Sequence, residues 1–404
     1  MKIIRNAPEE QAERSFSVEG IGKIVKRVKE QGDRAIFEYT ERFDGIKLSS
    51  IAVEKTKIER ARVDDRLERA LKEAKKRLEL FSSKQMEFMK GFSLEISEGV
   101  ETCQRVEPIE RIGIYVPGGK APLFSTLLMC AVPAKIAGVK EIAICTPPVV
   151  KDEVLYTAKL CGVDEIYSAG GAHAIAALAF GTESIRRVDK IFGPGNRYVT
   201  AAKKEVFGHV GIDMLAGPSE VLIIASENSD VEAIALDLIA QAEHGSDSIA
   251  TLITDSEDLA KRVSEEVEKK LNAFEWAREA IEKNGRIMLV EGKERAIELA
   301  NRIAPEHLEL MDERIDEREL KSFGSLFIGS PVAFGDYCAG INHVLPTNGS
   351  ARFSSALSVK DFLRTSNVLR VRDEGKKQMD CAKVMAEHEG MRAHAASIEH
   401  LNLG

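Results

Sequence analysis

Hydrophobic positions near the start of the chain recur at helical spacing. In VEGIGKIVKRVKEQGDRAIFEYTERF, one helical face collects Ile21, Ile24, Val25 and Val28. The stretch RLERALKEAKKRLELFSSKQME repeats this spacing among many oppositely charged residues, which is typical of a solvated outer helix face. The pattern predicts that residues 21–110 begin as amphipathic helices.

From Arg111 onward, short apolar runs alternate with helical stretches. RIGIYVPGG is an apolar run stopped by glycine, STLLMCAVPAKIAGV has helical spacing, and KEIAICTPP is the next run. A second series follows Ser219, with EVLIIAS, SDVEAIALDLIAQAEHG and SIATLITD. Strands that alternate with helices of about a dozen residues predict βαβ units and parallel sheets that are covered on both faces.

The two series and the length of 404 residues predict an α/β protein with two Rossmann-like parallel-sheet domains. The tail is polar, mostly helical in pattern and too poor in apolar residues to fold alone, so we expect it to pack elsewhere, such as on another subunit. The expected parts are an N-terminal segment (1–20), a first α/β domain (21–110 with 219–345), a second α/β domain (111–218) and the tail (346–404).

Composition narrows the class of protein. Hydrophobic residues make up 44% of the chain and charged residues 30%, as in ordinary soluble globular proteins. The net charge of −8 argues against a nucleic-acid partner, and no apolar run approaches the roughly 18 residues of a membrane helix. The 6 cysteines are scattered without a CxxC pair, which indicates reduced thiols and a cytoplasmic location.

Glycine turns follow several predicted strands. They are VPGGKAP, SAGGAHA and FGPGNRY, and none of them has the GxGxxG spacing of a dinucleotide-binding fingerprint. Any tight turn between a strand and a helix favours glycine, so each turn alone has an ordinary structural explanation. Because open α/β sheets bind ligands outside the carboxyl ends of their strands, several such turns on one sheet indicate a ligand crevice.

Histidines and carboxylates gather in a few polar stretches. In DLIAQAEHGSDS, Gln241 and His244 are three residues apart and can share one helix face, although for this stretch alone a polar helix end capped by Gly245 is the favoured explanation. In APEHLEL, Glu306 and His307 form a possible acid–base pair. Neighbours in an extended chain face opposite ways, so we expect them to serve different atoms or opposite sides of one pocket.

A glycine-rich stretch, GDYCAGINHVLPT, follows the predicted strand SLFIG. It carries Asp336 and His343, and loops at strand ends often hold functional residues. Asp336 could equally be a turn former beside Gly335. Cys338 is a weak candidate nucleophile, because the nearby Asp336 would raise the pKa of its thiol.

Several long stretches resemble signature blocks of the histidinol dehydrogenase family, in the same order and over residues 111–394. They are RIGIYVPGGKAPLFSTLLMCAVPAKIAG, FGPGNRYVTAAK, AGPSEVLIIAS, DLIAQAEHG, APEHLEL, GDYCAGINHVLPT and EHEGMRAH. The resemblance implies an aldehyde-dehydrogenase-like fold and a homodimer with shared active sites and exchanged tails. It also implies one Zn²⁺ per subunit and NAD. The expected reaction is the oxidation of L-histidinol through L-histidinal to L-histidine, at the end of histidine biosynthesis.

The resemblance assigns roles to residues at matching positions. Glu306 and His307 would be catalytic, with His307 as the base in both oxidation steps and Glu306 as the group that activates water. The family pattern usually has glutamine where this chain has His173, whose ring can also donate or accept a hydrogen bond. The other roles are zinc ligation by Gln241, His244, Asp336 and the partner's His394, cofactor binding by Tyr115, His173 and Asn196, and substrate binding by Ser219, Gln241, His244, His307, Asp336, His343, Glu389 and His394.

Other functions fit part of the same residue set. A zinc hydrolase of a small amide would use the same ligands to activate water, and the glycine turns would then only build the sheet. An aldehyde dehydrogenase acting through Cys338 would need that thiol. A non-catalytic scaffold held by zinc would leave Glu306 and His307 without a role.

Overall fold

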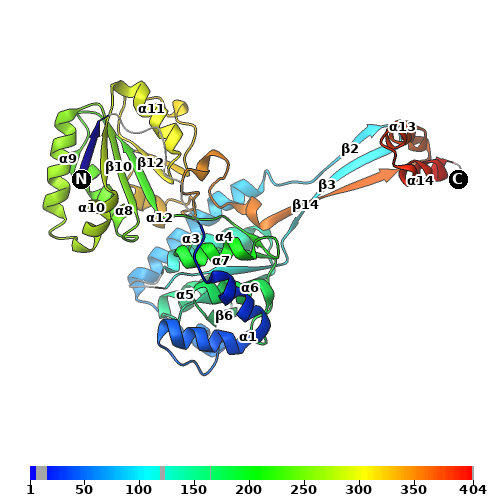
Figure 1. Ribbon diagram of the computed structural model, residues 1–404, viewed down its shortest axis with the longest axis horizontal. Coiled ribbons are helices and arrows are strands. Elements are labelled where there is room, and N and C mark those ends of the chain that lie inside the picture. Colours follow the sequence, from blue (N-terminus) through cyan, green and yellow to red (C-terminus); the bar gives the residue numbers. More distant parts are fainter. Residues whose placement is uncertain (6–15, 119–122, 164, 403–404) are drawn as a thin grey trace.

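The computed structural model describes residues 1–5, 16–118, 123–163 and 165–402. The chain forms two α/β domains that lie against each other, and a long arm that projects from them and ends in the C-terminal helices (Figure 1). The glycine turn VPGGKAP lies partly outside the described residues, because they end at Gly118 and resume at Leu123.

One domain, here called the five-stranded domain, is built on a parallel sheet in the order β6-β5-β4-β7-β8. Its strands are apolar on both faces, as expected for a parallel sheet covered by helices. The strands are β4 (Arg111–Tyr115), β5 (Glu141–Thr146), β6 (Glu165–Ser168), β7 (Lys190–Phe192) and β8 (Gly211–Ile212). The helices between them are α4 (Phe124–Ala137), α5 (Asp152–Leu160), α6 (Gly171–Phe180) and α7 (Arg197–Val206).

The N-terminal helices cover this same sheet. They are α1 (Ile21–Asp44), α2 (Lys55–Arg60) and α3 (Asp65–Met86). Val28 and Ile36 of α1 are buried in one cluster with α6 and α7, and Leu78 of α3 is buried in another with α4 and α5. The prediction that residues 21–110 join residues 219–345 was therefore wrong, because an amphipathic stripe shows that a helix packs but not on which sheet.

The second domain, here called the six-stranded domain, has a parallel sheet in the order β1-β11-β10-β9-β12-β13. The N-terminal segment contributes its edge strand, β1 (Lys2–Arg5), which pairs with β11. The other strands are β9 (Glu220–Ile224), β10 (Ile249–Thr254), β11 (Arg286–Leu289), β12 (His307–Leu310) and β13 (Ser325–Ile328). The helices are α8 (Val231–Ala242), α9 (Glu257–Lys270), α10 (Arg278–Asn284), α11 (Gly292–Ile303) and α12 (Val332–Tyr337).

The arm is an antiparallel ribbon that the hydrophobic pattern did not predict. It pairs β2 (Phe92–Ser97) with β3 (Val100–Pro108), and β3 with β14 (Leu363–Val371). Beyond β14 lie α13 (Asp380–His388) and α14 (Arg392–Asn402) at the far end of the arm (Figure 1). Strands were expected only from Arg111 onward, and the tail was expected to be mostly helical. The tail contains α13 and α14, as expected, but the expectation missed β2, β3 and β14. In β2, FSLEIS alternates apolar and polar residues as a strand does, so a signal was present there, whereas β14 has no such clear alternation.

Apolar side chains of the arm face solvent. Phe92, Leu94 and Ile96 of β2 are more than half exposed, and so are Val384 and Met385 of α13. Exposed apolar side chains of this kind are typical of a surface that contacts another molecule. No helix within the described ranges is long and apolar enough to cross a membrane.

Two carboxyl groups are buried together between α8 and β12. Asp237 and Glu309 are almost fully buried and hydrogen bond to each other, and the Glu309 Oε2 atom has no further partner. Burial raises the pKa of Glu309, and the charge of Asp237 raises it further. The pair therefore holds a proton that an exposed glutamate would release.

This proton makes stability depend on pH. Above the ordinary glutamate pKa, the folded chain keeps a proton that the unfolded chain has lost, so stability falls as pH rises. In Glu309→Gln, the amide can donate a hydrogen bond to Asp237 without binding that extra proton. We therefore expect the Tm of this variant to fall less than the Tm of wild type when the pH is raised from about 5.5 to about 8.5. The difference should reach about 2 °C by scanning calorimetry. Glu265→Gln, at an exposed position of α9, controls for removal of a carboxylate, and equal losses in all three proteins would contradict the expectation.

Candidate active site

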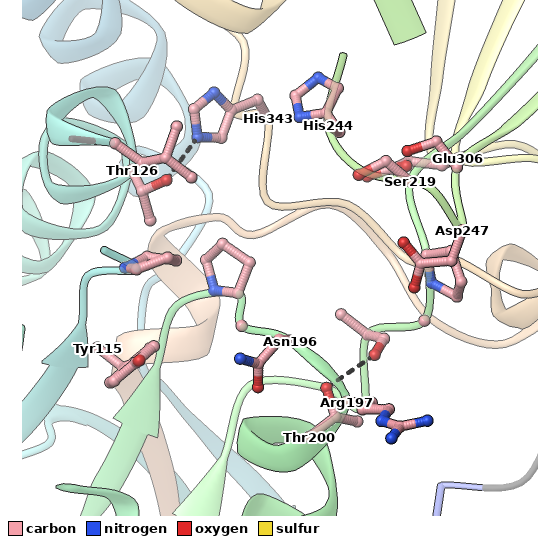
Figure 2. A pocket seen from close by; sticks show the side chains of 18 of the residues that line it. Tyr115, Thr126, Asn196, Arg197, Thr200, Ser219, His244, Asp247, Glu306 and His343 are labelled. Carbon is pink, nitrogen blue, oxygen red and sulfur yellow. Dashed lines mark hydrogen bonds between the residues drawn. The ribbon is translucent and has the colours of Figure 1, made fainter. Parts of the chain in front are cut away.

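A pocket of about 620 Å³ lies between the two domains. Figure 2 shows Tyr115, Asn196 and Arg197 on one side, and His244, Glu306 and Ser219 on the other. Predicted site residues that line the pocket are Tyr115, Asn196, Ser219, His244, Glu306, His307, Asp336 and His343.

The two sheets present opposite edges to this pocket. The five-stranded sheet contributes its carboxyl edge, where Tyr115 ends β4 and Gly195 follows β7. The six-stranded sheet contributes its amino edge, where Ser219 precedes β9 and His307 begins β12. The crevice rule for parallel sheets thus holds for one domain only.

Glu306 and His307 converge on the backbone of Glu220, the first residue of β9. The Glu220 N–H donates to Glu306 Oε2 at 2.8 Å, and the His307 Nδ1 lies 3.2 Å from the Glu220 carbonyl oxygen. The two side chains come within 3.6 Å of each other. The expectation that they face opposite ways was wrong, because β12 begins only at His307 and the alternation of a strand does not extend to Glu306.

These contacts determine the tautomer of His307. A carbonyl oxygen only accepts, so Nδ1 must carry the proton that it donates to Glu220. The other ring nitrogen, Nε2, lies 3.3 Å from Asp336 Oδ1 at the pocket. Nε2 is therefore the atom through which His307 can take up or give back a proton.

Burial and charge act in opposite directions on this pair. Burial raises the pKa of Glu306 to about 7, although His307 and the Glu220 N–H both oppose that rise. Burial alone would lower the pKa of His307, but the Glu306 carboxylate and Asp336 together raise it to about 9. Glu306 thus changes charge near neutral pH, whereas His307 keeps both ring protons until the pH approaches 9 and must release the Nε2 proton before it acts as a base.

His244 and Gln241 occupy the end of α8 and the turn that follows. The helix ends at Ala242, so Gln241 lies on the helix and His244 in the turn. The His244 ring is exposed to the pocket, yet the pocket walls exclude enough water to lower its pKa, and Asp336 partly offsets that effect. Gln241 is buried, and its Nε2 atom has no hydrogen-bond partner.

His343 and Asp336 are joined through the loop that follows α12. The His343 Nδ1 donates to the Asp336 backbone carbonyl at 2.6 Å, and its Nε2 lies 3.4 Å from the Thr126 hydroxyl (Figure 2). Burial lowers the pKa of His343 and favours its neutral form. Burial would raise the pKa of Asp336, but the contact with His307 and the nearby histidine charges lower it.

On the opposite wall, Asn196 begins α7. Its side-chain oxygen accepts from the N–H groups of Tyr198 and Val199, so it caps the helix. Tyr115 is buried at the end of β4, and its hydroxyl accepts from the Gly171 N–H at 3.0 Å. These contacts align the first turn of α7 and the end of β4 along one side of the pocket.

Four predicted site residues are not part of the pocket lining: Gln241, at the end of α8, and three that lie farther away. His173 is buried between α6 and α1, with its Nε2 3.4 Å from the Thr40 hydroxyl, and burial lowers its pKa to about 4. Glu389 follows α13 and His394 lies in α14, at the far end of the arm from the pocket (Figure 1). The geometry gives no support to the assignment of His173 as a cofactor contact.

Sequence analysis missed some residues that shape the site. Glu220 holds both Glu306 and His307 through its backbone, and its carboxylate accepts from the Asn348 N–H at 2.7 Å. An acidic residue at the start of the apolar strand EVLII was the available signal, since glutamate is rarely buried without a partner. Arg197 and Asp247 also line the pocket, but nothing in their sequence context distinguishes them from surface charges.

Within the described residues of one chain, no group of three or more His, Cys, Asp or Glu side chains is arranged to hold a metal ion. His244 and Asp336 both line the pocket. Of the described residues that line it, none is a cysteine, so Cys338 has no direct access to a ligand there.

Comparison with known proteins assigns the family. The family model described as histidinol dehydrogenase matches residues 7–401. The chain belongs to the histidinol dehydrogenase family. It is therefore an enzyme of the dehydrogenase class.

Individual relatives agree with this assignment. The chain is 45% identical to a histidinol dehydrogenase of Bacillus cereus, with 99% of this chain and 95% of the relative covered. The crystal structure of histidinol dehydrogenase from Elizabethkingia anophelis is 38% identical, covers 100% of this chain and 98% of its own, and has a TM-score of 0.91. A putative aldehyde dehydrogenase from Burkholderia cenocepacia, 16% identical with 90% and 88% covered, has a TM-score of 0.52 and shares the fold alone.

The raised pKa of Glu306 gives the dehydrogenase a testable pH profile. The groups that face Glu306 are the adjacent His307, Glu220 of β9 and Asp336 of α12. A step that needs the Glu306 carboxylate should accelerate as pH rises through about 7, because the carboxylate forms there. Initial rates with histidinol over this range should show that rise in wild type and in Glu309→Gln, a buried control on β12, but not in Glu306→Gln. A rise that persists in Glu306→Gln would assign it to another group.

Proposed function

We propose that this dehydrogenase oxidises L-histidinol through L-histidinal to L-histidine, with NAD as the hydride acceptor in both steps and one Zn²⁺ per subunit. The observation that carries the proposal is the convergence of Glu306 and His307 on Glu220, opposite the Asn196 turn of the same pocket. An acid–base pair and a cofactor crevice then face each other across the space available to a small substrate.

The donor set at the end of α8 fits a zinc ion. His244 and Asp336 supply an imidazole nitrogen and a carboxylate, both common zinc ligands. The buried Gln241 amide has an unsatisfied polar atom, which is costly unless a ligand or ion meets it. A 180° rotation of the amide group exchanges its oxygen and nitrogen, so the oxygen can face the ion. The fourth protein ligand would be His394 of the partner subunit.

Zinc bound there would supply a positively charged template for the imidazole and amino nitrogens of the substrate. The chain's own residues carry the protons. Neutral His307 takes the hydroxyl proton of histidinol at Nε2 as the carbon that bears this hydroxyl loses a hydride to NAD. In the second step, the Glu306 carboxylate takes a proton from the water that adds to the aldehyde, and His307 returns its Nε2 proton to the carbonyl oxygen, which gives the diol. His307 Nε2 then takes a hydroxyl proton of the diol as the same carbon loses a second hydride to a second NAD.

The remaining pocket residues orient substrate and cofactor. Ser219 and His343 line the pocket beside Glu306 and Thr126, respectively, where their polar atoms can bind the substrate. Tyr115 and Asn196 line the carboxyl edge of the five-stranded sheet, where parallel sheets receive dinucleotides. The cytoplasm, where NAD and reduced thiols are maintained, is the proposed location.

We propose further that two chains share each active site as a homodimer. Glu389 and His394 are at the end of the arm, far from the pocket of their own chain (Figure 1). The exposed apolar residues of β2 and α13 give the arm a surface to bury against a second copy. A two-fold pair of arms would bring Glu389 to the substrate and His394 to the zinc of the other chain.

The alternatives explain less. A zinc hydrolase of a small amide would use the same donors, but membership of a dehydrogenase family favours oxidation. Catalysis through Cys338 is disfavoured because this residue lies beyond the pocket lining. A zinc-stabilised scaffold would not require two buried titratable groups at the pocket.

Metal content and NAD reduction, measured on one preparation of the purified protein, test the proposed function. We expect about one zinc per chain and histidinol-dependent formation of NADH, followed by absorbance, with two NADH formed for each histidinol consumed. The proposal would be rejected if adding histidinol and NAD produced no NADH, or if the protein hydrolysed a small amide faster than it oxidised histidinol.

The two half-reactions separate the roles of Glu306 and His307. Because only the second step needs water, Glu306→Gln should slow histidinal oxidation about 10²-fold and histidinol oxidation much less. His307→Asn should slow both steps by about 10²-fold or more. Single-turnover rates with each substrate measure this difference. Equal losses for Glu306→Gln in both half-reactions would show that the two roles are not divided.

Mixing two inactive variants tests the shared site. After co-refolding of His307→Asn with His394→Asn, a hybrid dimer has one site with both defects and one site with neither. Random pairing makes half of the dimers hybrids, so about a quarter of the wild-type activity should return. Each variant refolded alone is the control. Hybrids that form, as shown by mass spectrometry of tagged chains, but stay inactive would mean that the tail serves its own chain.

A further inference from the structure

A buried ion pair lies in the five-stranded domain behind the proposed cofactor crevice. Lys203 of α7 and Asp213, just after β8, are 2.5 Å apart, and their side chains are 4% and 1% exposed. A buried ion pair is poor evidence for stability, because desolvation of the two charges offsets much of their attraction. The other hydrogen bonds of Lys203 and Asp213 indicate what the pair does.

Both members of the pair bind the same residue. The Lys203 Nζ donates to the Gly193 carbonyl oxygen at 2.5 Å, and the Gly193 N–H donates to Asp213 Oδ2 at 2.8 Å. The carboxylate also accepts from the Met214 N–H through Oδ1. The ion pair therefore satisfies both backbone polar groups of Gly193, the first residue of the turn that follows β7.

Gly193 has no room to move away from this pair. Its φ of 103° lies in the region that favours glycine, and a Cβ atom there would come within 2.2 Å of the Tyr115 carbonyl oxygen. The turn is thus held between the Tyr115 backbone on one side and Lys203 with Asp213 on the other. Immediately after Gly193, the chain supplies Pro194, Gly195 and Asn196 to the pocket lining.

Asp213 also begins the segment that crosses to the six-stranded domain. Along this segment, the Ala216 carbonyl accepts from the Thr200 hydroxyl at 2.9 Å, and the Gly217 N–H donates to the Thr347 hydroxyl at 2.5 Å. The segment reaches the pocket at Ser219. One buried pair therefore orients the Asn196 turn and anchors the start of the crossing between domains.

We propose that Lys203 and Asp213 are positioning residues for the cofactor: they hold the turn over residues 193–196 in the one place where it can receive the dinucleotide. This inference rests on the proposed NAD site. Neither residue touches the pocket, so both act through Gly193 and the turn. Their removal should weaken NAD binding and leave the acid–base pair on the opposite wall intact.

A second ion pair in the same sheet provides the control. Arg111 at the start of β4 lies 2.6 Å from Glu165 of β6, with side chains 7% and 28% exposed. This pair lies at the amino edge, whereas the pocket is at the carboxyl edge of the same strands. Arg111→Met should thus destabilise the same sheet without disturbing the turn over residues 193–196. It therefore distinguishes an effect of lower overall stability from an effect of a displaced turn.

The experiment measures NAD affinity and the two Michaelis constants in Lys203→Met and Arg111→Met. By titration calorimetry, Lys203→Met should raise the Kd for NAD about tenfold or more, since small displacements of binding groups are costly. Its KM for histidinol, its zinc content and its kcat at saturating NAD should stay within about twofold of wild type. Arg111→Met should lower Tm but leave the Kd for NAD within about twofold. Equal changes in NAD affinity in both variants would overturn the proposal.

Lys203→Met leaves Asp213 buried without a partner and could prevent folding. The double variant Lys203→Met/Asp213→Leu removes both charges, and buried pairs replaced by apolar residues of similar size often retain stability. It also removes both contacts to Gly193, so NAD affinity should still fall about tenfold. Wild-type affinity in this folded double variant would overturn the proposal.

Asn196→Ala distinguishes this inference from the proposed cofactor site itself. If wild type binds no NAD, or if Asn196→Ala binds it as wild type does, the cofactor site is wrong and the positioning role is overturned with it. If wild type binds NAD and Asn196→Ala weakens binding while both Lys203 variants bind normally, the positioning role alone is overturned. Weaker binding in Asn196→Ala and in both Lys203 variants supports both inferences.

Discussion

The geometry of the Glu306–His307 pair depends on two hydrogen bonds to the backbone of one residue. Glu220 offers its N–H to Glu306 and its carbonyl to His307, and it can do both because β9 and β12 are neighbours in register, with His307 opposite Val221. The two strands pair over four residue pairs, which fixes the backbone of β12 relative to that of β9. The positions of the Glu306 carboxylate and the His307 imidazole are therefore set by the pairing of the strands. Side chains held in this way are better positioned than side chains on loops.

The two sheets contribute to the pocket in different ways because they present opposite edges. At a carboxyl edge, chains leave the strands through glycine turns and enter helices by their N-termini, which suits a bound phosphate. At an amino edge, chains arrive from helix ends, and here the arriving segments carry Ser219, His244 and Glu306. One domain thereby lines the pocket with the turn at Gly195 and Asn196, and the other lines it with ionisable side chains such as Glu306 and His307.

Much of the fold could be predicted because buried parallel strands read as apolar runs between glycine turns. The arm was missed: FSLEIS of β2 alternates apolar and polar residues as a strand does, but β14 has no clear alternation that would identify its partner strand. The place of α1 was missed because its apolar stripe fits either sheet. Candidate site residues could be recognised where adjacent ionisable side chains suggest acid–base chemistry, as Glu306 and His307 do. Lys203 and Asp213 were missed because a single lysine or aspartate in sequence reads as surface charge, and only folding brings them together.

The pairing of β14 with β3 has a consequence for the order in which the molecule forms. It joins Leu363 to Pro108 and Val371 to Val100, so the arm closes only after nearly the whole chain has been made. Contacts so distant in sequence form slowly, and the β2–β3 hairpin must wait with an open edge while both domains assemble. An open edge bordered by apolar side chains is a site of misassociation. The last strand to leave the ribosome therefore protects the first hairpin, and synthesis that stops short of it leaves an aggregation-prone edge on two otherwise complete domains.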